Sequence, residues 1–384
     1  MRIAIFDYKV IPTNPSGGCH RRVLEALCLD HDFTVFAVEF DNPCPHRVTW
    51  VRIPVPTRPL VLLFLSYHVV APMAYLAHRL RHRVRYDLVQ RVENNLSFGH
   101  VSYVHFCHRF FLSRIWPTMG TRGLRARVRW LDHLFHALLE PVIYKRTLHF
   151  VVPSIGLERE FANEYEFAIP RIVRIPNPID VDRYMTPKNF DRERIRQRHN
   201  LAPQDVVLVF TALGQFERKG LPLVLEALPD LPEHVKLMVV GGSPDLVRTY
   251  ERRAAKMGLK NRTVFVGMTK DLRQYLWSAD VFIFPSFYEV FSLSAHEAAA
   301  AGLPIIATPV HGLTESFRDQ ENAFLIESTV DGVRAGIERF ISLSETERAE
   351  MGVRGRETVQ QYHPSRFGDR WKNFYEAFAD SLPR

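Results

Sequence analysis

Two glutamates follow a strand pattern and flank the start of a helix, and their spacing suits the binding of a phosphorylated sugar. Glu289 and Glu297, with seven residues between them, come after the apolar run 281–284, and a helical pattern begins near Ser292. In an open parallel sheet, ligands bind beyond the carboxyl ends of the strands. The start of a helix offers free N–H groups and a positive dipole end that suit a diphosphate. Each carboxylate accepts hydrogen bonds from sugar hydroxyls.

A structural interpretation of the same residues is also open. Ser294 and Glu297 fit a capping box, in which the glutamate only satisfies the start of the helix. A glutamate in a loop, such as Glu289, is commonly just solvated. Because Glu289 and Glu297 lie at the same strand–loop–helix corner, a binding site explains the two together better than a capping box and a solvated loop residue do.

A pair of cations is the second candidate feature. Arg218 and Lys219 precede Gly220, after the strand pattern 206–211 and at the beginning of another helical pattern. Basic side chains at the start of a helix oppose its dipole, so a bound anion explains the pair better than solvation alone. The alternative is that both side chains are simply solvated.

Short β-branched runs alternate with helical patterns along the whole chain, which predicts an α/β fold of parallel sheets covered by helices. The predicted strands are residues 2–7, 33–38, 48–53, 87–90, 101–105, 149–152, 171–175, 206–211, 235–240, 263–266, 281–284, 304–307 and 323–326. A connector rich in proline at 175–180 separates two Rossmann-like halves. We therefore expect domains over 1–180 and 181–363, followed by a C-terminal helix over 364–384 for which the N-terminal domain is one candidate partner.

The frame around the two glutamates, Pro-Ser…Glu…Phe…Leu…Glu-Ala…Ala-Gly-Leu-Pro over residues 285–304, resembles the retaining GT-B glycosyltransferases of family four. The resemblance extends over nearly the whole chain. It implies two Rossmann-like, doubly wound domains that face an interdomain cleft. In that family the first glutamate, here Glu289, contacts the donor sugar, and the second, Glu297, binds the ribose.

The resemblance also assigns roles to residues outside the glutamate pair. The implied diphosphate-binding groups are Arg218, Lys219, Gly17 and Gly18, with the backbone amides of Phe291, Ser292 and Leu293. The implied base-binding residues are Met268 and Thr269, through their backbone. His105, after the strand pattern 101–105, would lie by the donor sugar and act with Glu289 in catalysis.

Some of these positions have plain alternatives or depart from the family pattern. Gly17 and Gly18 lie between the first strand and the first helix, where a simple turn is an equally good explanation. His105 is as readily a buried core residue. Val290 and Ser292 stand where relatives carry glycines, and Gln215 stands where many carry an arginine.

The resemblance implies a retaining hexosyltransferase. It would move a hexose from a UDP- or GDP-linked donor to a glycan or lipid-linked acceptor in cell-envelope polysaccharide, lipopolysaccharide or glycolipid synthesis. Two alternatives stay open: a sugar-nucleotide epimerase of GT-B fold, and a non-catalytic subunit that binds sugar nucleotides.

The formal net charge of +8 favours anionic partners. An uncharged stretch at 59–77 precedes Arg79, Arg81, Arg83 and Arg85, and a second apolar stripe at 124–142 is flanked by Arg122, Arg125, Arg127 and Arg129. We expect peripheral binding to the cytoplasmic face of an anionic membrane. A membrane span at 59–77 and an ordinary core-facing helix at 124–142 are the alternatives. A nucleic-acid partner would explain the charge but not the glutamate pair.

No metal or other cofactor is expected. Asp180 and Asp182 look like a metal-binding pair but lie in the connector, and His105, Cys107 and His108 have no second ligand pair after them, so neither set predicts a metal site. Transfer should therefore survive EDTA. The cysteines, Cys19, Cys28, Cys44 and Cys107, contain no CxxC pair and predict reduced thiols in a cytoplasmic protein.

Overall fold

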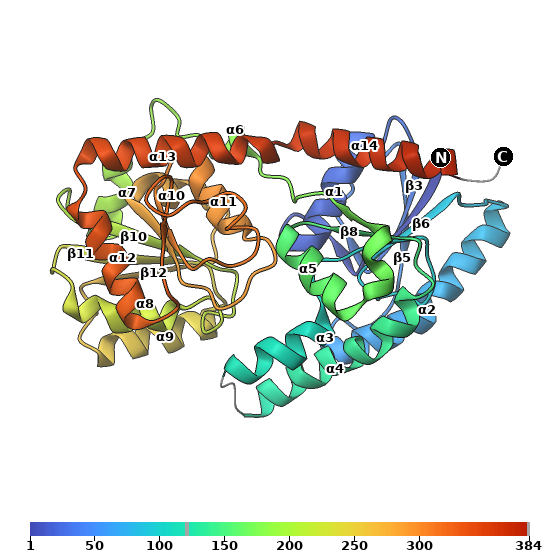
Figure 1. Ribbon diagram of the computed structural model, residues 1–384, viewed down its shortest axis with the longest axis horizontal. Coiled ribbons are helices and arrows are strands. Elements are labelled where there is room, and N and C mark those ends of the chain that lie inside the picture. The colour runs from blue at the N-terminus through green and yellow to red at the C-terminus, as the bar shows by residue number, and fades with distance from the viewer. Residues whose placement is uncertain (120–122, 382–384) are drawn as a thin grey trace. The chain divides into compact units, whose positions relative to one another are not determined.

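The computed structural model describes residues 1–119 and 123–381 and divides the chain into two compact units. Unit 1 comprises Met1–Pro178 together with Pro364–Arg384, and unit 2 comprises Ile179–His363. Each unit is an α/β structure built on a parallel sheet, as the alternating pattern predicts (Figure 1). The C-terminal helix belongs to unit 1 although the sequence places it after unit 2.

The sheet of unit 1 has the strand order β5-β3-β1-β6-β7-β8-β9, and each neighbouring pair is parallel. In that order the strands are Val48–Arg52, Asp32–Ala37, Arg2–Phe6, Leu88–Val92, Val101–Tyr103, His149–Val152 and Ile172–Arg174. A separate short pair joins β2 (Lys9–Val10) to β4 (Glu39–Phe40). The carboxyl ends of these parallel strands therefore share one edge of the sheet.

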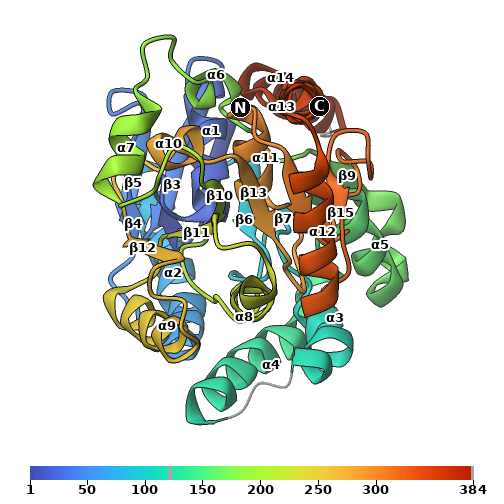
Figure 2. The same cartoon turned by 90° about the vertical axis from the view of Figure 1, so that its left-hand side faces the viewer.

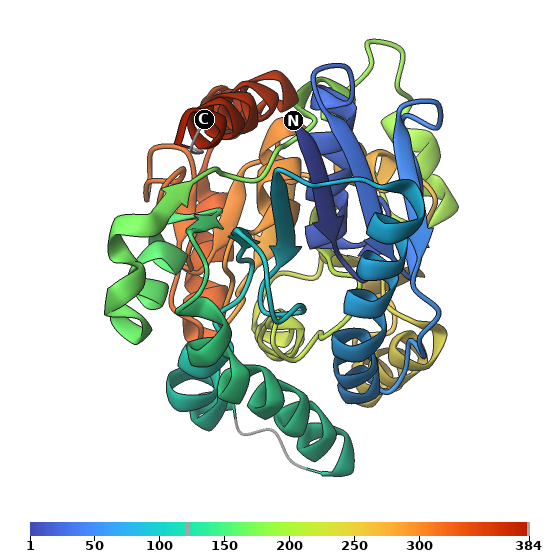
Figure 3. The same ribbon diagram turned by 90° about the vertical axis from the view of Figure 1, so that its right-hand side faces the viewer.

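Helices cover both faces of this sheet. Alternate side chains of β1 point to opposite faces: Ile3 and Ile5 join a core with α1 (Pro15–Leu27) and α14 (Pro364–Ser381), whereas Phe6 joins a core with α2 (Leu60–His82). The remaining helices of unit 1 are α3 (His108–Phe110), α4 (Leu124–Tyr144) and α5 (Ile155–Glu164). Figure 3 shows the side of the molecule on which unit 1 faces the viewer.

Unit 2 has the strand order β12-β11-β10-β13-β14-β15, again in parallel pairs. In that order the strands are Thr263–Gly267, Val235–Val240, Val206–Thr211, Val281–Phe284, Ile305–Ala307 and Phe324–Leu325. Its helices are α6 (Val181–Tyr184), α7 (Arg192–Arg198), α8 (Leu221–Ala227), α9 (Pro244–Lys256), α10 (Arg273–Ser278), α11 (Leu293–Ala300), α12 (Val330–Ser342) and α13 (Glu345–Val359). The central strand β10 is buried along its whole length, because helices cover both faces of a parallel sheet.

The prediction of four reduced cysteines is wrong for one pair. Cys28 and Cys44 form a disulfide with a Cα–Cα distance of 6.8 Å. Cys28 ends α1, and Cys44 lies in the loop before β5, so the pairing of β3 with β5 brings the two together. Their separation of 16 residues gave no local motif for this pairing.

The uncharged stretch at 59–77 forms most of α2. Among the described residues α2 is the helix that is long and apolar enough to cross a membrane, by length and composition. In unit 1 it connects β5 to β6, and Leu63, Phe64, Tyr67 and Ala71 on one of its faces are buried. This face packs on the sheet as a crossover helix does.

Candidate active site

The loops at the carboxyl edge of the unit 2 sheet bring most of the predicted site residues together. All strands of this sheet run parallel, so the loops after β10, β11, β12 and β13 leave from one edge (Figure 2). These loops carry residues 212–220, 241–243, 268–272 and 285–292. This edge is where ligands bind in open α/β sheets.

Glu289 lies against both predicted cations. Its Oε1 atom pairs with Lys219 Nζ in a short contact and is 3.5 Å from Arg218 Nη1. Ser286 donates a hydrogen bond of 2.9 Å to the same oxygen. Arg218 also donates to the backbone carbonyl of Tyr288 and to Gln215 Oε1. The loops after β10 and β13 thus form one charged cluster, which we call the Glu289 cluster: Glu289, Lys219, Arg218 and Ser286.

Electrostatics keeps Glu289 ionised. Burial by itself would raise the pKa of Glu289, but Lys219, Arg218 and the hydrogen bonds from Lys219 and Ser286 lower it below its ordinary value. Burial lowers the pKa of Lys219, and Glu289 opposes this change. A buried carboxylate with paired cations is an arrangement that can bind both the hydroxyls and the phosphates of a ligand.

The backbone at position 220, directly after the two cations, requires a glycine. Gly220 has φ +82°, and a Cβ atom there would lie 2.1 Å from the carbonyl oxygen of Pro285. Only glycine permits both the left-handed conformation and this approach. The loop of Arg218 and Lys219 therefore packs directly on the backbone that leads to Glu289.

Glu297 does not form the capping box that its spacing allowed. Helix α11 begins with Ser292 as its N-cap residue, which makes no side-chain capping bond to the described chain, and Ser294 is the second helical residue. Glu297 instead hydrogen-bonds Tyr184 of α6. Burial raises the pKa of Glu297 to about 7, against the opposing effects of Tyr184 and Arg183. Tyr184 was not predicted from the sequence, since a single tyrosine in the short helix α6 belongs to no motif.

The replaced glycines do not distort the loop before α11. Ser292 has φ −76°, and Val290 is not among the residues with a positive φ. Neither position therefore requires glycine. The glycine that lets another segment approach this loop closely is Gly312, where a Cβ atom would lie 2.9 Å from Phe291 Cα. Phe291 stacks on His296 with ring centroids 4.5 Å apart. The backbone amides at the start of α11, from Leu293 onward, lie at the carboxyl edge of the sheet, where a diphosphate would bind.

Met268 and Thr269 follow β12 at the same edge. The Met268 side chain is exposed, and the Thr269 hydroxyl accepts a 3.2 Å hydrogen bond from the Asp271 amide. Between them and the Glu289 cluster, Gly241 and Gly242 follow β11 with positive φ values. A Cβ on Gly241 would lie 2.1 Å from the Ala212 carbonyl oxygen. This glycine pair was not predicted as part of the site, although two glycines directly after a strand pattern are a visible signal.

Gly17 and Gly18 lie in unit 1 and not in a loop. Both belong to the first turn of α1, where Asn14 is the N-cap residue. The Gly17 amide donates to Asn14 Oδ1 and the Gly18 amide to the Asn14 carbonyl oxygen. A Cβ on Gly17 would lie 1.7 Å from the Lys9 carbonyl oxygen. The loop prediction is wrong, because the helix starts at Pro15, and the glycines have a packing reason of their own.

His105 also belongs to unit 1, two residues beyond the end of β7. Burial lowers its pKa to about 3, so the ring is neutral at physiological pH. Its Nε2 atom is buried and has no hydrogen-bond partner in the part of the chain that the structure describes. A neutral imidazole with one unpaired nitrogen can donate to or accept from a hydroxyl group.

Known families match both halves of the chain. Residues 191–358 match the family described as Glycosyl transferases group 1, and residues 21–183 match Glycosyltransferase Family 4. An uncharacterized glycosyltransferase of Methanocaldococcus jannaschii is 30% identical over 363 residues, which cover 89% of each chain. Several other curated glycosyltransferases match over about half of their length.

Solved structures share the fold. The crystal structure of WaaG, a glycosyltransferase involved in lipopolysaccharide biosynthesis, aligns with a TM-score of 0.78 at 20% identity, over 97% of this chain and 99% of that one. Anabaena HepE in complex with UDP and glucose aligns with a TM-score of 0.74 at 17% identity, over 98% of this chain and 100% of that one. These similarities identify the two α/β units as a GT-B fold.

Proposed function

The chain belongs to the family 4, group 1 glycosyltransferases, and we propose that it is a retaining hexosyltransferase. In this proposal it moves a hexose from a UDP- or GDP-linked donor to a glycan or lipid-linked acceptor of the cell envelope. The observation that supports the proposal most is the Glu289 cluster at the carboxyl edge of the unit 2 sheet. The relative HepE carries UDP and glucose in its structure, and WaaG acts in lipopolysaccharide synthesis.

The proposed chemistry gives the protein an electrostatic role. The bond between the anomeric carbon and the diphosphate oxygen breaks, and negative charge builds on the diphosphate. Arg218, Lys219 and the amides of Phe291, Ser292 and Leu293 stabilise that charge. The acceptor hydroxyl attacks from the same face and gives its proton to the departing diphosphate, so the configuration is retained. The chemistry itself requires no divalent metal.

The other residues position the donor. Glu289 holds sugar hydroxyls and His105 makes a further hydrogen bond to the sugar, which restricts the reacting geometry. Glu297 binds the ribose, while Met268 and Thr269 hold the base through their backbone. Gly17 and Gly18 contribute through the absence of side chains, since their amides are already bonded to Asn14.

A ligand screen followed by a transfer assay tests this function. UDP, GDP and ADP are compared for their effect on thermal unfolding, where a ligand at 100 times its Kd adds about 2.7 kcal/mol to stability. The sugar-linked form of the best nucleotide is then assayed with and without a glycan acceptor in EDTA. We expect transfer that depends on the acceptor and persists in EDTA. Conversion of the donor without an acceptor would indicate an epimerase, and binding without any conversion would indicate a non-catalytic subunit.

A second part of the proposal concerns the membrane, because both apolar stripes are exposed. On α2 the outer residues are Leu62, Leu65, Val69, Met73, Leu76 and Leu80. On α4 they are Leu124, Val128, Leu131, Phe135, Leu138 and Val142. The core-facing alternative is wrong for α4, since its opposite face, with His136, Glu140 and Tyr144, is the buried one. Both helices lie along the lower side of unit 1 in Figure 1.

Exposed arginines accompany these stripes. The last turn of α2 contains Arg81, and Arg83 and Arg85 follow the helix. On α4 the exposed arginines are Arg127 and Arg129. Arg122 lies outside the described residues, as does the side chain of Arg125. An amphipathic helix with apolar and basic outer residues binds at an anionic lipid surface, and each arginine near such a surface contributes about 1 kcal/mol. We place the enzyme as a peripheral protein on the cytoplasmic face of the membrane.

Charged substitutions on the α4 stripe should release the protein from vesicles. We expect L138E combined with V142E to reduce binding to phosphatidylglycerol vesicles at least tenfold, since burying one leucine-sized side chain contributes about 1.5–3 kcal/mol. Flotation with vesicles of phosphatidylglycerol and phosphatidylcholine measures this. L29E, at another exposed leucine of unit 1, is the matched control. Equal binding by both variants, or no binding by the unaltered protein, would contradict the membrane proposal.

A further inference from the structure

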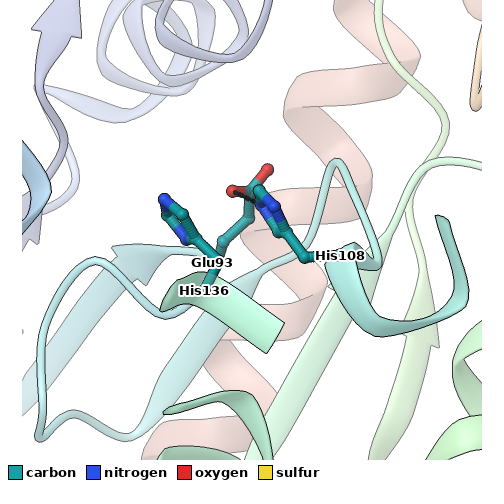
Figure 4. Close-up of side chains that lie close together, drawn as sticks. All are labelled: Glu93, His108 and His136. Carbon is teal, nitrogen blue, oxygen red and sulfur yellow. Dashed lines mark hydrogen bonds and ion pairs between the residues drawn. The ribbon is translucent and has the colours of Figure 1, made fainter. Parts of the chain in front are cut away.

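A cluster of two histidines and one glutamate lies at the carboxyl edge of the unit 1 sheet, and none of the three is among the residues proposed to bind the donor. Glu93 directly follows β6, His108 begins α3, and His136 lies on α4. One potential ligand atom from each side chain lies within 4.8 Å of the other two. Figure 4 shows the three side chains together, with the Glu93 carboxylate against the His108 ring.

Glu93 and His108 lie close enough to each other to share one ion. Glu93 Oε2 is 3.2 Å from His108 Nε2. An ion at 2.0–2.1 Å from each of its tetrahedral ligands holds them about 3.4 Å apart. Glu93 also has φ +48°, a left-handed conformation that a glutamate seldom adopts. Strained backbone of this kind gathers at functional positions.

Asn94 orients His136 in the manner of a ligand. His136 Nδ1 is 2.7 Å from Asn94 Oδ1, and the Asn94 amide nitrogen donates to the His136 carbonyl oxygen at 2.9 Å. Because Oδ1 can only accept, Nδ1 must carry the proton. The Nε2 atom is then left with its lone pair. Histidines that bind metals commonly have their other nitrogen bonded to a carbonyl oxygen in this way.

Two buried polar atoms beside the cluster have no hydrogen-bond partner among residues 1–119 and 123–381. They are Asp132 Oδ1 and the hydroxyl of Tyr8. Asp132 lies close enough to Glu93 and His108 for an electrostatic interaction, and Tyr8 to Glu93 and Asp132. A buried polar atom without a partner is costly, so the surroundings of the cluster favour a bound group with its water.

We propose that Glu93, His108 and His136 bind a zinc ion in unit 1. Two imidazole nitrogens and one carboxylate oxygen suit zinc, whereas magnesium and calcium prefer oxygen ligands alone. Three protein ligands leave a fourth position for a water molecule, which supplies a donor for Asp132. The ligands are 15 and 28 residues apart along the chain, so the site has no local sequence motif.

Binding requires one rearrangement. The His108 and His136 rings are stacked, with centroids 4.1 Å apart and planes 6° apart. A metal binds in the plane of an imidazole ring, so two parallel rings cannot both direct their lone pairs at one ion. Asn94 holds His136 through two hydrogen bonds, whereas one contact of 3.0 Å with His133 Nδ1 holds the Nδ1 atom of His108. We therefore expect the His108 ring to give up this contact and turn out of the stack.

The ion would anchor α4 to the sheet. It joins the end of β6, the start of α3 and the inner face of α4, whose outer face carries the exposed apolar stripe. This role is structural and uses none of the residues proposed to bind the donor. The inference therefore does not depend on the proposed transfer reaction.

Metal titration of the full chain tests the site. The protein is stripped with a chelator, dialysed and titrated with zinc chloride by calorimetry, and cobalt(II) absorption reports the geometry. We expect one zinc per chain, a tetrahedral cobalt spectrum, and a rise in the unfolding temperature on adding zinc. E93Q and H136Q should each weaken zinc binding at least about tenfold and abolish the thermal shift. H46Q, at an exposed histidine of the same unit, should leave both unchanged.

Two results would overturn the proposal. The first is absence of stoichiometric zinc binding by the folded, unaltered protein. The second is zinc affinity in the E93Q/H136Q double variant equal to that of H46Q. Circular dichroism establishes that each variant is folded, and N94A offers a second route because it leaves all three ligands in place and should still weaken binding by about 10- to 100-fold.

Discussion

Replacing Lys219 with alanine should weaken the binding of a nucleoside diphosphate by about 10- to 150-fold. A charge-assisted hydrogen bond contributes about 1.5–3 kcal/mol, and each 1.4 kcal/mol is a factor of ten in affinity. Lys219 and Arg218 are the cations of the Glu289 cluster, so R218A should show a loss of the same order. Calorimetry with UDP and GDP measures both variants.

The pairing of Lys219 with Glu289 requires a control, because K219A leaves a buried carboxylate with one cation fewer. The double variant K219A/E289Q removes that unpaired charge. If Lys219 contacts the diphosphate, the double variant binds as weakly as K219A; recovery of affinity would mean that the loss came from Glu289. K256A, at an exposed lysine of α9, should bind normally. Normal binding by both K219A and R218A would remove the two cations from the donor site.

The two glutamates should lose different properties when each is replaced by glutamine. E289Q should keep nucleoside diphosphate binding but lose turnover by about 10- to 150-fold, because its proposed partner is the transferred sugar. E297Q should bind the free diphosphate more weakly, because its proposed partner is the ribose. The measurements are affinity for the free diphosphate and turnover with the intact sugar nucleotide. We would abandon these roles if both variants lost the same property, or if neither lost any.

The pH dependence of binding gives a second reading of Glu297. Its pKa of about 7 means that the carboxylate forms as the pH rises from 6 to 8. If the charged form accepts the ribose hydroxyls, affinity for the diphosphate rises over this window. The diphosphate titrates in the same range, so the informative quantity is the difference between the unaltered protein and E297Q. Identical pH profiles would show that Glu297 does not bind the nucleotide.

The strands were predictable because their signal is local. Each predicted strand is present among the described residues, and residues 206–211 form β10 with unchanged ends. A short apolar run between turn signals forms either a buried strand or a short buried helix, and its β-branched residues favour the strand. The ends of other strands were less predictable: 101–105 shortens to Val101–Tyr103, since the neighbouring strand β6 ends at Val92, the residue that pairs with Tyr103.

The site was predictable only in part. The spacing of Glu289 and Glu297 and the Arg-Lys-Gly sequence were visible, and their roles rested on resemblance. The contact between Lys219 and Glu289, 70 residues apart, exists because β10 and β13 are neighbours in the sheet. Strand order departs from chain order here, since β11 and β12 lie on the other side of β10. No pattern within either loop specifies that order.

The periodicity of α4 shows most clearly where local information ends. The spacing of its apolar residues defined a face of the helix, and both a buried and an exposed face were consistent with it. In the structure the other face of α4, with His136 and Glu140, is buried, and the apolar stripe is exposed to solvent. The packing of this buried face also places His136 beside Glu93 and His108. Periodicity measures how side chains are distributed around a helix, whereas burial depends on which neighbour the helix meets, and that neighbour is distant in the chain.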